Sequence, residues 1–264
     1  LEDHFLVVSW DQPGAGKSFR AVPHEDLSLE TYLEDTHALV ELLCARFGRE
    51  KVYIWGESWG SALGLLYAQA HPERVKMFFG TGQMVAFLEN DLECYALAVD
   101  WLRSKGDVKK AEKLERQGPP PYPRGRGTAG KLAAFLMETT AYMREERGIR
   151  TGGDTIAEIF SSEYTLGDRV NWVRGLFETL DHFYPTLWEV DLRERIPRLE
   201  VPVVFLLGRH DVNASIPLFL DFYDGLEAPF KTAVWFERSG HTPYSSESGR
   251  FVEELVRWSR RSDL

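Results

Sequence analysis

The stretch from Lys51 to Ala70 constrains this chain most, because a short strand changes directly into a helix within it. Val52–Trp55 is an apolar run that is long enough for a buried strand and too short for a helix. From Ser61 the composition changes to alanine and leucine, which favour helices. Between these segments stands Gly56-Glu57-Ser58-Trp59-Gly60, a G-x-S-x-G pattern. The pattern therefore has the strand and the helix on either side that give it chemical meaning.

A strand that turns at once into a helix forces the residue at the turn into a strained left-handed conformation. Gly56 and Gly60 are expected to leave room where a Cβ atom would collide. Such a turn lifts the Ser58 hydroxyl above the sheet, at the positive N-terminus of the following helix. An ordinary loop serine between two structural glycines would show the same five letters, but the flanking elements favour a nucleophile. Serine is a weak nucleophile, so a base and an orienting acid are expected elsewhere in the chain.

Composition limits the classes of partner and compartment. The 264 residues are 44% hydrophobic, which is enough for one large α/β domain or two small ones. The net charge of −10 argues against nucleic acid or an anionic membrane as a partner. Cys44 and Cys94 form neither a metal motif nor a disulfide framework, and they favour a reducing cytoplasm. No signal peptide is recognisable, and no stretch reaches the roughly 18 apolar residues of a membrane span.

The N-terminal part offers a second possible motif. Phe5–Trp10 is an apolar run that favours a buried strand, and it is followed by a glycine-rich run ending in Gly16-Lys17-Ser18. A phosphate-binding loop would need glycine where Asp11 stands and a helix directly afterwards, yet Pro23 follows within a few residues. We therefore interpret this segment as a tight turn and expect Lys17 to bind no nucleotide phosphate.

Strands and helices alternate at both ends of the chain. Ser28 is the predicted N-cap of a helix over Leu29–Phe47, which Gly48 ends, and Val75–Phe79 is the next predicted strand. After Pro197 strands return at 203–207 and 231–236, and an amphipathic helix over 247–260 closes the chain. The alternation predicts an α/β fold with a mostly parallel sheet and helices on both faces.

The middle of the chain breaks this rhythm. Residues 84–196 contain no convincing strand, and helices are predicted over 88–105, 108–117 and 131–147. We interpret this region as an inserted helical cap on a core made of residues 1–83 and 197–264. Its aromatic side chains are expected either to form a small core or to line a pocket: Trp172, Phe177, Phe183, Tyr184 and Trp188.

Two residues near the C-terminus fit the base and the acid. His241 directly follows a strand end, and Gly240 lets its loop bend toward the carboxyl edge of the sheet, where chemistry gathers in open parallel sheets. Asp211 stands in the equivalent place one strand earlier, where it could also be a simple helix cap. The order Ser58, Asp211, His241 is the order of an α/β-hydrolase triad. The other six histidines are interpreted as surface or packing residues.

On these motifs the chain resembles the α/β-hydrolase superfamily and, within it, the proline iminopeptidase-like group. The resemblance covers most of the chain, and its segments begin at Trp10, Gly56, Gly82, Gly118, Gly208 and Ser239. It implies Ser58 as nucleophile, His241 as general base and then acid, and Asp211 as its orienter. The backbone amide of Trp59 would be one oxyanion donor, and neither a metal nor a cofactor is expected.

The resemblance leaves the substrate open. The group usually has a second glycine where this chain has Glu57, and the Glu-Asn-His-Tyr-Phe element of its cap has no match here. An N-terminal aminopeptidase and a carboxylesterase both remain candidates, and an amine substrate would require a cap acid such as Glu178 or Glu189. The alternative from another class is a non-catalytic ligand-binding protein on a hydrolase scaffold.

The resemblance also implies that part of the sheet lies upstream of this chain. The Ser58 strand would be the fifth of the family's sheet and Phe5–Trp10 the fourth, with the third strand between them. The absent segment would also carry a His-Gly-Gly-Pro-Gly loop that supplies a second oxyanion donor. We therefore expect an upstream segment that fills the gap between Phe5–Trp10 and Val52–Trp55.

Overall fold

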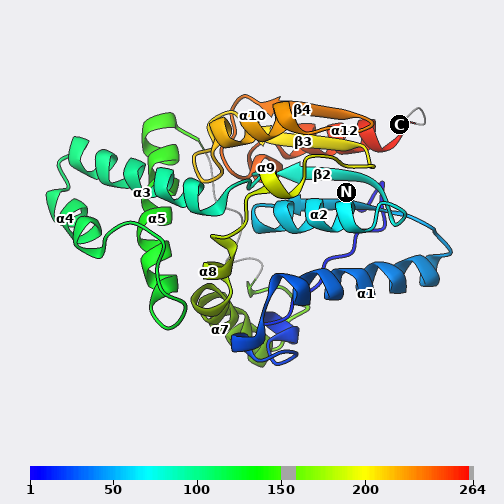
Figure 1. The fold of residues 1–264 in the computed structure, drawn as a ribbon, viewed down its shortest axis with the longest axis horizontal. Coiled ribbons are helices and arrows are strands. Elements are labelled where there is room, and N and C mark those ends of the chain that lie inside the picture. The colour runs from blue at the N-terminus through cyan, green and yellow to red at the C-terminus, as the bar shows by residue number, and fades with distance from the viewer. Residues whose placement is uncertain (150–158, 262–264) are drawn as a thin grey trace.

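Four parallel strands form the sheet of the computed structural model, which describes residues 1–149 and 159–261. They are β1 (Val52–Glu57), β2 (Val75–Thr81), β3 (Val203–Gly208) and β4 (Lys231–Phe236), and they lie side by side in chain order (Figure 1). Every residue of β3 is buried, as expected for a central strand covered on both faces. The parallel sheet and the strands at Val52, Val75, Val203 and Lys231 confirm the predicted fold class.

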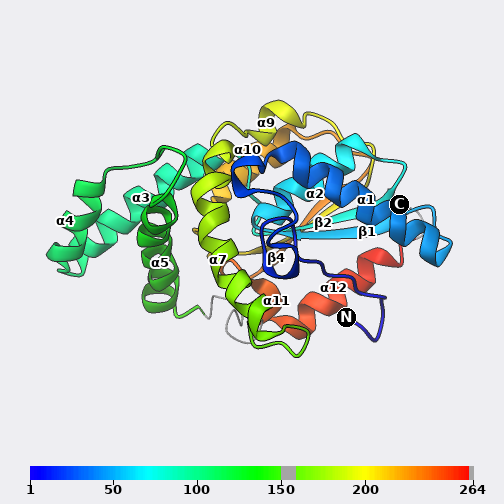
Figure 2. The same ribbon diagram turned by 90° about the horizontal axis from the view of Figure 1, so that it is seen from below.

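Helices cover the two faces of the sheet. On one face, α2 (Trp59–Ala70) and α10 (Ile216–Gly225) pack on Val203, Phe205 and Leu207, with α1 (Leu29–Phe47) outside α2. On the other face, α12 (Ser248–Ser259) packs on Val204 and Leu206, because side chains alternate along β3. Figure 2 shows α1 and α2 on one side of the strands and α12 on the other. α10 was not predicted from the sequence.

The helix α1 has the bounds that its capping residues predicted. The Ser28 hydroxyl accepts a hydrogen bond from the Thr31 amide at 3.2 Å, and Gly48 follows the last turn. The helix buries Tyr32, Val40 and Cys44 along one side. Cap and apolar face therefore agree, as in a typical amphipathic surface helix.

The segment between β2 and β3 is helical in its described part. Its helices are α3 (Phe87–Ser104), α4 (Val108–Gln117), α5 (Thr128–Arg147), α7 (Leu166–His182), α8 (Tyr184–Leu187) and α9 (Leu192–Arg195). Figure 1 shows α3, α4 and α5 reaching away from the sheet, with α7 and α8 below it. Residues 150–158 of the predicted cap lie outside the described residues. The division into core and cap stays a prediction.

The strand predicted at Phe5–Trp10 does not form. These residues have no ladder partners in the described part of the chain, and the side chains of Leu6, Val7, Val8 and Trp10 are exposed. A strand needs a neighbour for its backbone groups, and among the described residues β1 pairs with β2 alone. Phe5–Trp10 has the apolar composition of a strand, but no described strand lies beside it to pair with its backbone.

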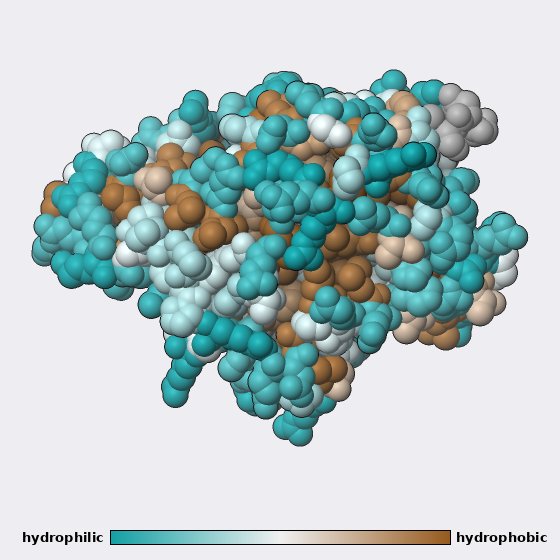
Figure 3. All heavy atoms as spheres, viewed as in Figure 1, coloured by the Kyte–Doolittle hydropathy of each residue, from teal (hydrophilic) through white to brown (hydrophobic). Residues whose placement is uncertain are grey.

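The remaining described elements are short, and the surface of the molecule is mostly polar in the view of Figure 3. The one-turn elements are η1 (Gly16–Ser18), η2 (His24–Asp26) and α11 (Pro243–Ser246). None of the described helices is long and apolar enough to cross a membrane. Figure 3 shows polar residues over most of one face, with a hydrophobic area near its centre over α2.

Candidate active site

Ser58 stands at the turn between β1 and α2 in an unusual backbone conformation. Its φ of 52° is positive, and no other non-glycine residue in the described part of the chain shares this property. Its ψ of −122° places it outside the left-handed helical region that the pattern predicted. A conformation of this kind costs roughly 1–3 kcal/mol, so the surroundings must hold it in place.

Hydrogen bonds and one glycine hold this turn. The Ser58 amide donates to the Thr81 carbonyl at 3.0 Å, and the Ser58 carbonyl accepts from the Ser61 hydroxyl at 2.6 Å. A Cβ atom at Gly56 would collide with the carbonyl oxygen of Gly60, whereas a Cβ atom at Gly60 would meet nothing within 4 Å. The space argument therefore holds for Gly56 and was wrong for Gly60.

The residue after Ser58 begins the helix. Because α2 starts at Trp59, the Trp59 amide belongs to the first turn, whose amides have no intrahelical acceptor. The indole Nε1 of Trp59 donates to Gln12 Oε1 at 3.2 Å, and its ring packs on Phe183 with centroids 5.0 Å apart. The Trp59 amide is therefore placed beside the Ser58 hydroxyl at the positive end of the helix.

His241 and Asp211 are hydrogen-bonded to each other. His241 Nδ1 lies 2.9 Å from Asp211 Oδ2, and the other carboxylate oxygen accepts from the amides of Asn213 and Ala214. Asp211 thus caps the turn after β3 and is hydrogen-bonded to the imidazole, whereas the N-cap of α10 is Ser215. Its role as the orienting acid stays a prediction. The backbone of Gly82 lies against the ring, where a Cβ atom would come within 2.7 Å of His241 Cε1.

Ser58 and His241 line the same cavity. Both contribute to its wall, but no hydrogen bond joins them among the described residues. The Nε2 atom of His241 instead lies 3.5 Å from Glu57 Oε1. The expected hydrogen bond between His241 and Asp211 is present, whereas the described part of the structure has none between His241 and Ser58.

The charges around His241 change its acidity. Burial alone would lower the pKa of His241, but the charge and hydrogen bond of Asp211 and the charge of Glu57 outweigh burial and raise it to about 9. The imidazole is therefore mostly protonated near neutral pH.

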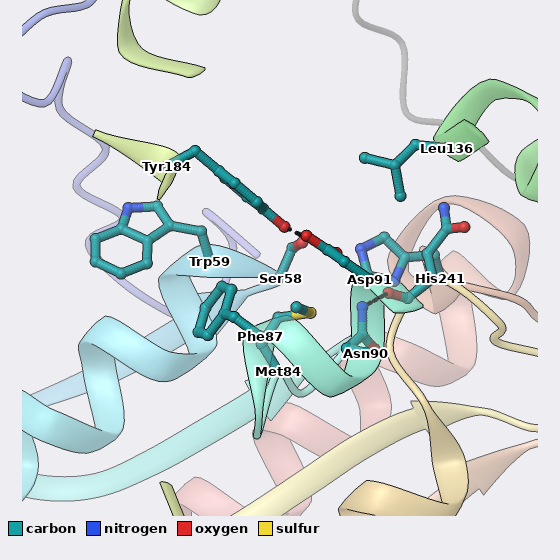
Figure 4. A pocket seen from close by; sticks show the side chains of 10 residues that line it. Ser58, Trp59, Met84, Phe87, Asn90, Asp91, Leu136, Tyr184 and His241 are labelled. Carbon is teal, nitrogen blue, oxygen red and sulfur yellow. Dashed lines mark hydrogen bonds between the residues drawn. The ribbon is translucent and has the colours of Figure 1, made fainter. Parts of the chain in front are cut away.

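The cavity at Ser58 has a volume of about 130 Å³. An apolar cavity of roughly 150 Å³ holds one benzene molecule, so this space suits a group the size of one side chain. Figure 4 shows Trp59, Phe87 and Met84 along one side and Tyr184 reaching in from α8. The wall contains both apolar surface and convergent polar groups, which is typical of small-molecule sites.

Asp91 of α3 is the acid in this cavity, and the sequence did not predict it. It is fully buried, and it accepts a hydrogen bond from Trp188 Nε1 at 2.7 Å. It also accepts one from the Tyr184 hydroxyl at 3.2 Å (Figure 4). Burial, opposed by these hydrogen bonds, raises the pKa of Asp91 to about 6. No lysine or arginine is among the described residues that line the cavity. Asp91 is therefore a buried carboxylate that mostly carries its charge at neutral pH, and its hydrogen-bond partners Trp188 and Tyr184 are neutral.

The two acids named from the sequence lie elsewhere. Glu178 pairs with Arg174 at 3.0 Å and faces His24 at 3.4 Å, and Glu189 is exposed. The naming of Glu178 and Glu189 was therefore wrong. The predicted cap aromatics are divided: Tyr184 lines the cavity, Phe183 and Trp188 are buried, and Phe177 is exposed.

The loop around Lys17 does not have the shape of a phosphate site. The Lys17 amide donates to Asp11 Oδ2 at 2.8 Å, and Asp11 also accepts from the Tyr164 hydroxyl. An internal carboxylate thus takes a donor that a phosphate would need. Within the described residues, no group of three or more His, Cys, Asp or Glu side chains could hold a metal ion.

Comparison with known proteins places this geometry in a family. A family model described as the alpha/beta hydrolase fold matches residues 1–138, which is more than half of the chain. The chain belongs to the α/β-hydrolase family. The predictions of this family and of a hydrolase are therefore confirmed.

Similar proteins in the family carry peptidase names. The hydrolase is 29% identical to the probable aminopeptidase YbaC of Bacillus subtilis (strain 168), over 98% of this chain and 81% of that protein. It is 40% identical to a probable proline iminopeptidase of Streptomyces coelicolor, but this match covers 30% of the chain and only 24% of that protein. The crystal structure of a proline iminopeptidase from Mycobacterium smegmatis superposes with a TM-score of 0.60 over 94% of this chain and 77% of that one, at 18% identity.

Proposed function

We propose that Ser58, His241 and Asp211 form the catalytic triad of this hydrolase. Ser58 Oγ attacks the substrate carbonyl, His241 Nε2 takes the hydroxyl proton, and Asp211 holds the imidazole through Nδ1. The proton passes to the leaving group, and a water activated by His241 then hydrolyses the acyl-enzyme. The Trp59 amide donates to the developing oxyanion. The observation that carries the proposal is Ser58 at a sharp strand–helix turn, in one cavity with the hydrogen-bonded pair His241–Asp211.

We infer that the substrate carries an amine, as in an aminopeptidase. Asp91 supports this, because a buried carboxylate in a cavity that no described lysine or arginine lines is costly, and a substrate ammonium would compensate it. The cavity has room for about one side chain beside the reacting carbonyl, which fits an N-terminal residue. The peptidase names of the relatives agree with this class of substrate.

The nucleophile is tested by removing its oxygen. Ser58→Ala is expected to lower kcat about 10³-fold or more on any substrate that the wild type cleaves, with an unchanged circular dichroism spectrum. The wild type should also be labelled at Ser58 by a fluorophosphonate probe, as shown by peptide mass spectrometry. Absence of labelling in a folded wild type would favour the non-catalytic binding protein.

The amine preference is tested by removing one charge. Asp91→Asn is expected to lower kcat/KM on an aminoacyl arylamide about tenfold to a hundredfold, because the ammonium loses its charged partner. Activity on a neutral acetyl ester should change little. Glu89→Gln is the matched control, because Glu89 lies on the same helix and pairs with Arg193 on the surface. Equal losses on both substrates would favour a carboxylesterase in which Asp91 is structural.

We also propose that a further strand completes the sheet beside β1, which supports the expectation of an upstream segment. β1 pairs with β2 alone among the described residues. Apolar side chains are exposed at Trp55 of β1 and, near the N-terminus, at Leu6, Val7 and Val8. An open edge of this kind is a template for another strand. Cytoplasmic localisation stays a prediction, supported by the two buried free thiols, Cys44 and Cys94.

A further inference from the structure

The imidazole of His241 lies between two carboxylates. Its Nδ1 is 2.9 Å from Asp211 Oδ2, and its Nε2 is 3.5 Å from Glu57 Oε1. Because Asp211 occupies Nδ1, Nε2 is the atom that must accept the Ser58 proton. In this structure that atom faces Glu57.

The sheet fixes the position of Glu57. Glu57 is the last residue of β1 and is in register with Thr81 of β2. Side chains alternate along a strand, so Glu57 shares a face with Tyr53 and Trp55. Trp55 packs on Tyr244 of α11 and Phe251 of α12, with centroids 5.4 and 5.3 Å apart. Glu57 therefore points to the face on which the His241 loop and α11 lie, and a rigid strand end holds it there.

The charged groups around His241 are all acids. Asp211 reaches it from the turn after β3, Glu57 from the end of β1, and Asp91 of α3 lines the same cavity. The backbone of Gly82, directly after β2, lies against the ring. In the loop of His241 itself, Glu247 accepts from the Arg238 amide and the Ser239 hydroxyl. This arrangement stabilises the imidazolium, in agreement with the pKa of about 9 for His241.

We propose that Glu57 is a positioning residue that competes with Ser58 for His241 Nε2 and thereby holds the triad in a resting, protonated form at neutral pH. The proposal rests on the triad proposed above. For acyl transfer, His241 must lose the proton on Nε2, and Nε2 must then face the Ser58 hydroxyl instead of the Glu57 carboxylate. Glu57 thus adds to the effect of Asp211 and raises the pH above which the site becomes active.

The direction of the effect follows from the active form. Neutral imidazole is the base, so activity rises as pH increases through the pKa of His241. With a pKa of about 9, roughly one molecule in a hundred has a neutral His241 at pH 7. Removing the charge of Glu57 lowers this pKa, and each unit of decrease raises the neutral fraction at pH 7 about tenfold. A substitution beside the nucleophile should therefore accelerate the enzyme at neutral pH.

The test compares Glu57→Gln, Glu57→Asp and wild type in two measurements. The first is an NMR titration of the His241 ring nitrogens, which requires no substrate. The second is the rate of fluorophosphonate labelling against pH, in which the Ser58 Oγ–P bond forms, fluoride leaves and the Ser58 proton goes to His241 Nε2. Glu237→Gln is the matched control, because Glu237 follows β4 and pairs with Arg209 at 2.8 Å, away from His241.

Glu57→Gln is expected to move both midpoints to lower pH by similar amounts and to raise the labelling rate at pH 7 about tenfold per unit of movement. Glu57→Asp keeps the charge on a shorter side chain and should give intermediate midpoints, while Glu237→Gln should match wild type. An unmoved NMR midpoint in Glu57→Gln, or slower labelling at pH 7, would overturn the proposal. If the NMR midpoint moves while even the wild type is never labelled, the pairing of Glu57 with His241 stands and the proposed triad fails.

Discussion

Two titratable residues of the cavity have raised pKa values for opposite reasons. His241 becomes more basic because acids surround it, in spite of its burial. Asp91 becomes less acidic because it is buried, in spite of the donors Trp188 and Tyr184. Near neutral pH both groups are mostly charged. A substrate that changes their surroundings should therefore also change their pKa values.

The cost of the buried charge on Asp91 should be measurable as a pH-dependent free energy of unfolding. The folded pKa of about 6 lies above the ordinary 3.8, so between these values the folded state holds a proton that the unfolded state has released. Stability contributed by this group therefore falls as pH rises through that window, by about 3 kcal/mol in total. Asp91→Asn should raise the thermal unfolding midpoint at pH 8 and change it much less at pH 4. An equal change at both pH values would contradict the assignment.

The residues of the site differed in how far the sequence could predict them. Ser58, Asp211 and His241 each follow a strand end and have glycine close by, so the signal is local. Asp91 is different, because its surroundings come from Tyr184 and Trp188, which are 93 and 97 positions away in the chain. Burial of a side chain by distant segments leaves no local pattern, so the sequence offered Glu178 and Glu189 only as examples of a cap acid.

At the scale of elements, the sequence predicted those that carry their own signals. The cap at Ser28 and the apolar face of α1 are contained in one segment, and β3 is a continuous apolar run. Phe5–Trp10 has the composition of a strand but not the partner, and pairing depends on residues far away in sequence. A strand is therefore a property of two segments, whereas a capped helix can be recognised from one.

The turn between β1 and α2 makes different demands on its two glycines. Gly56→Ala should abolish labelling of Ser58 and lower the thermal midpoint, because the new Cβ atom would collide with the Gly60 carbonyl. Gly60→Ala should leave the fold unchanged or stabilise it by up to about 1 kcal/mol, because alanine is the better helix residue. Thermal unfolding and probe labelling of both variants check this pair. Equal damage from both would show that space at the turn is not the reason.

At the scale of the whole molecule, charge and cavity act in the same direction. The chain carries a net charge of −10, and the cavity contains the carboxylate of Asp91. An overall negative field attracts cations and is screened by salt.

This field predicts a difference between substrates. kcat/KM for a cationic aminoacyl arylamide should fall several-fold as sodium chloride rises from about 20 to 300 mM, whereas that for a neutral ester should stay nearly constant. Initial rates at low substrate concentration measure both. The same salt dependence for the two substrates would contradict electrostatic attraction of the amine.

The order of the strands has a consequence for how such an enzyme changes over generations. The four strands lie in chain order, and Ser58, Asp211 and His241 follow β1, β3 and β4, whereas Asp91 lies on α3 in the segment after β2. The helices from α3 to α9 lie between β2 and β3, so one stretch of the gene carries Asp91, Leu136 and Tyr184 of the cavity wall. Substitutions, insertions or recombination within that stretch can alter what is bound while the codons for nucleophile, base and orienting acid stay untouched. Inherited variation in selectivity is thus separated from inherited variation in bond-breaking.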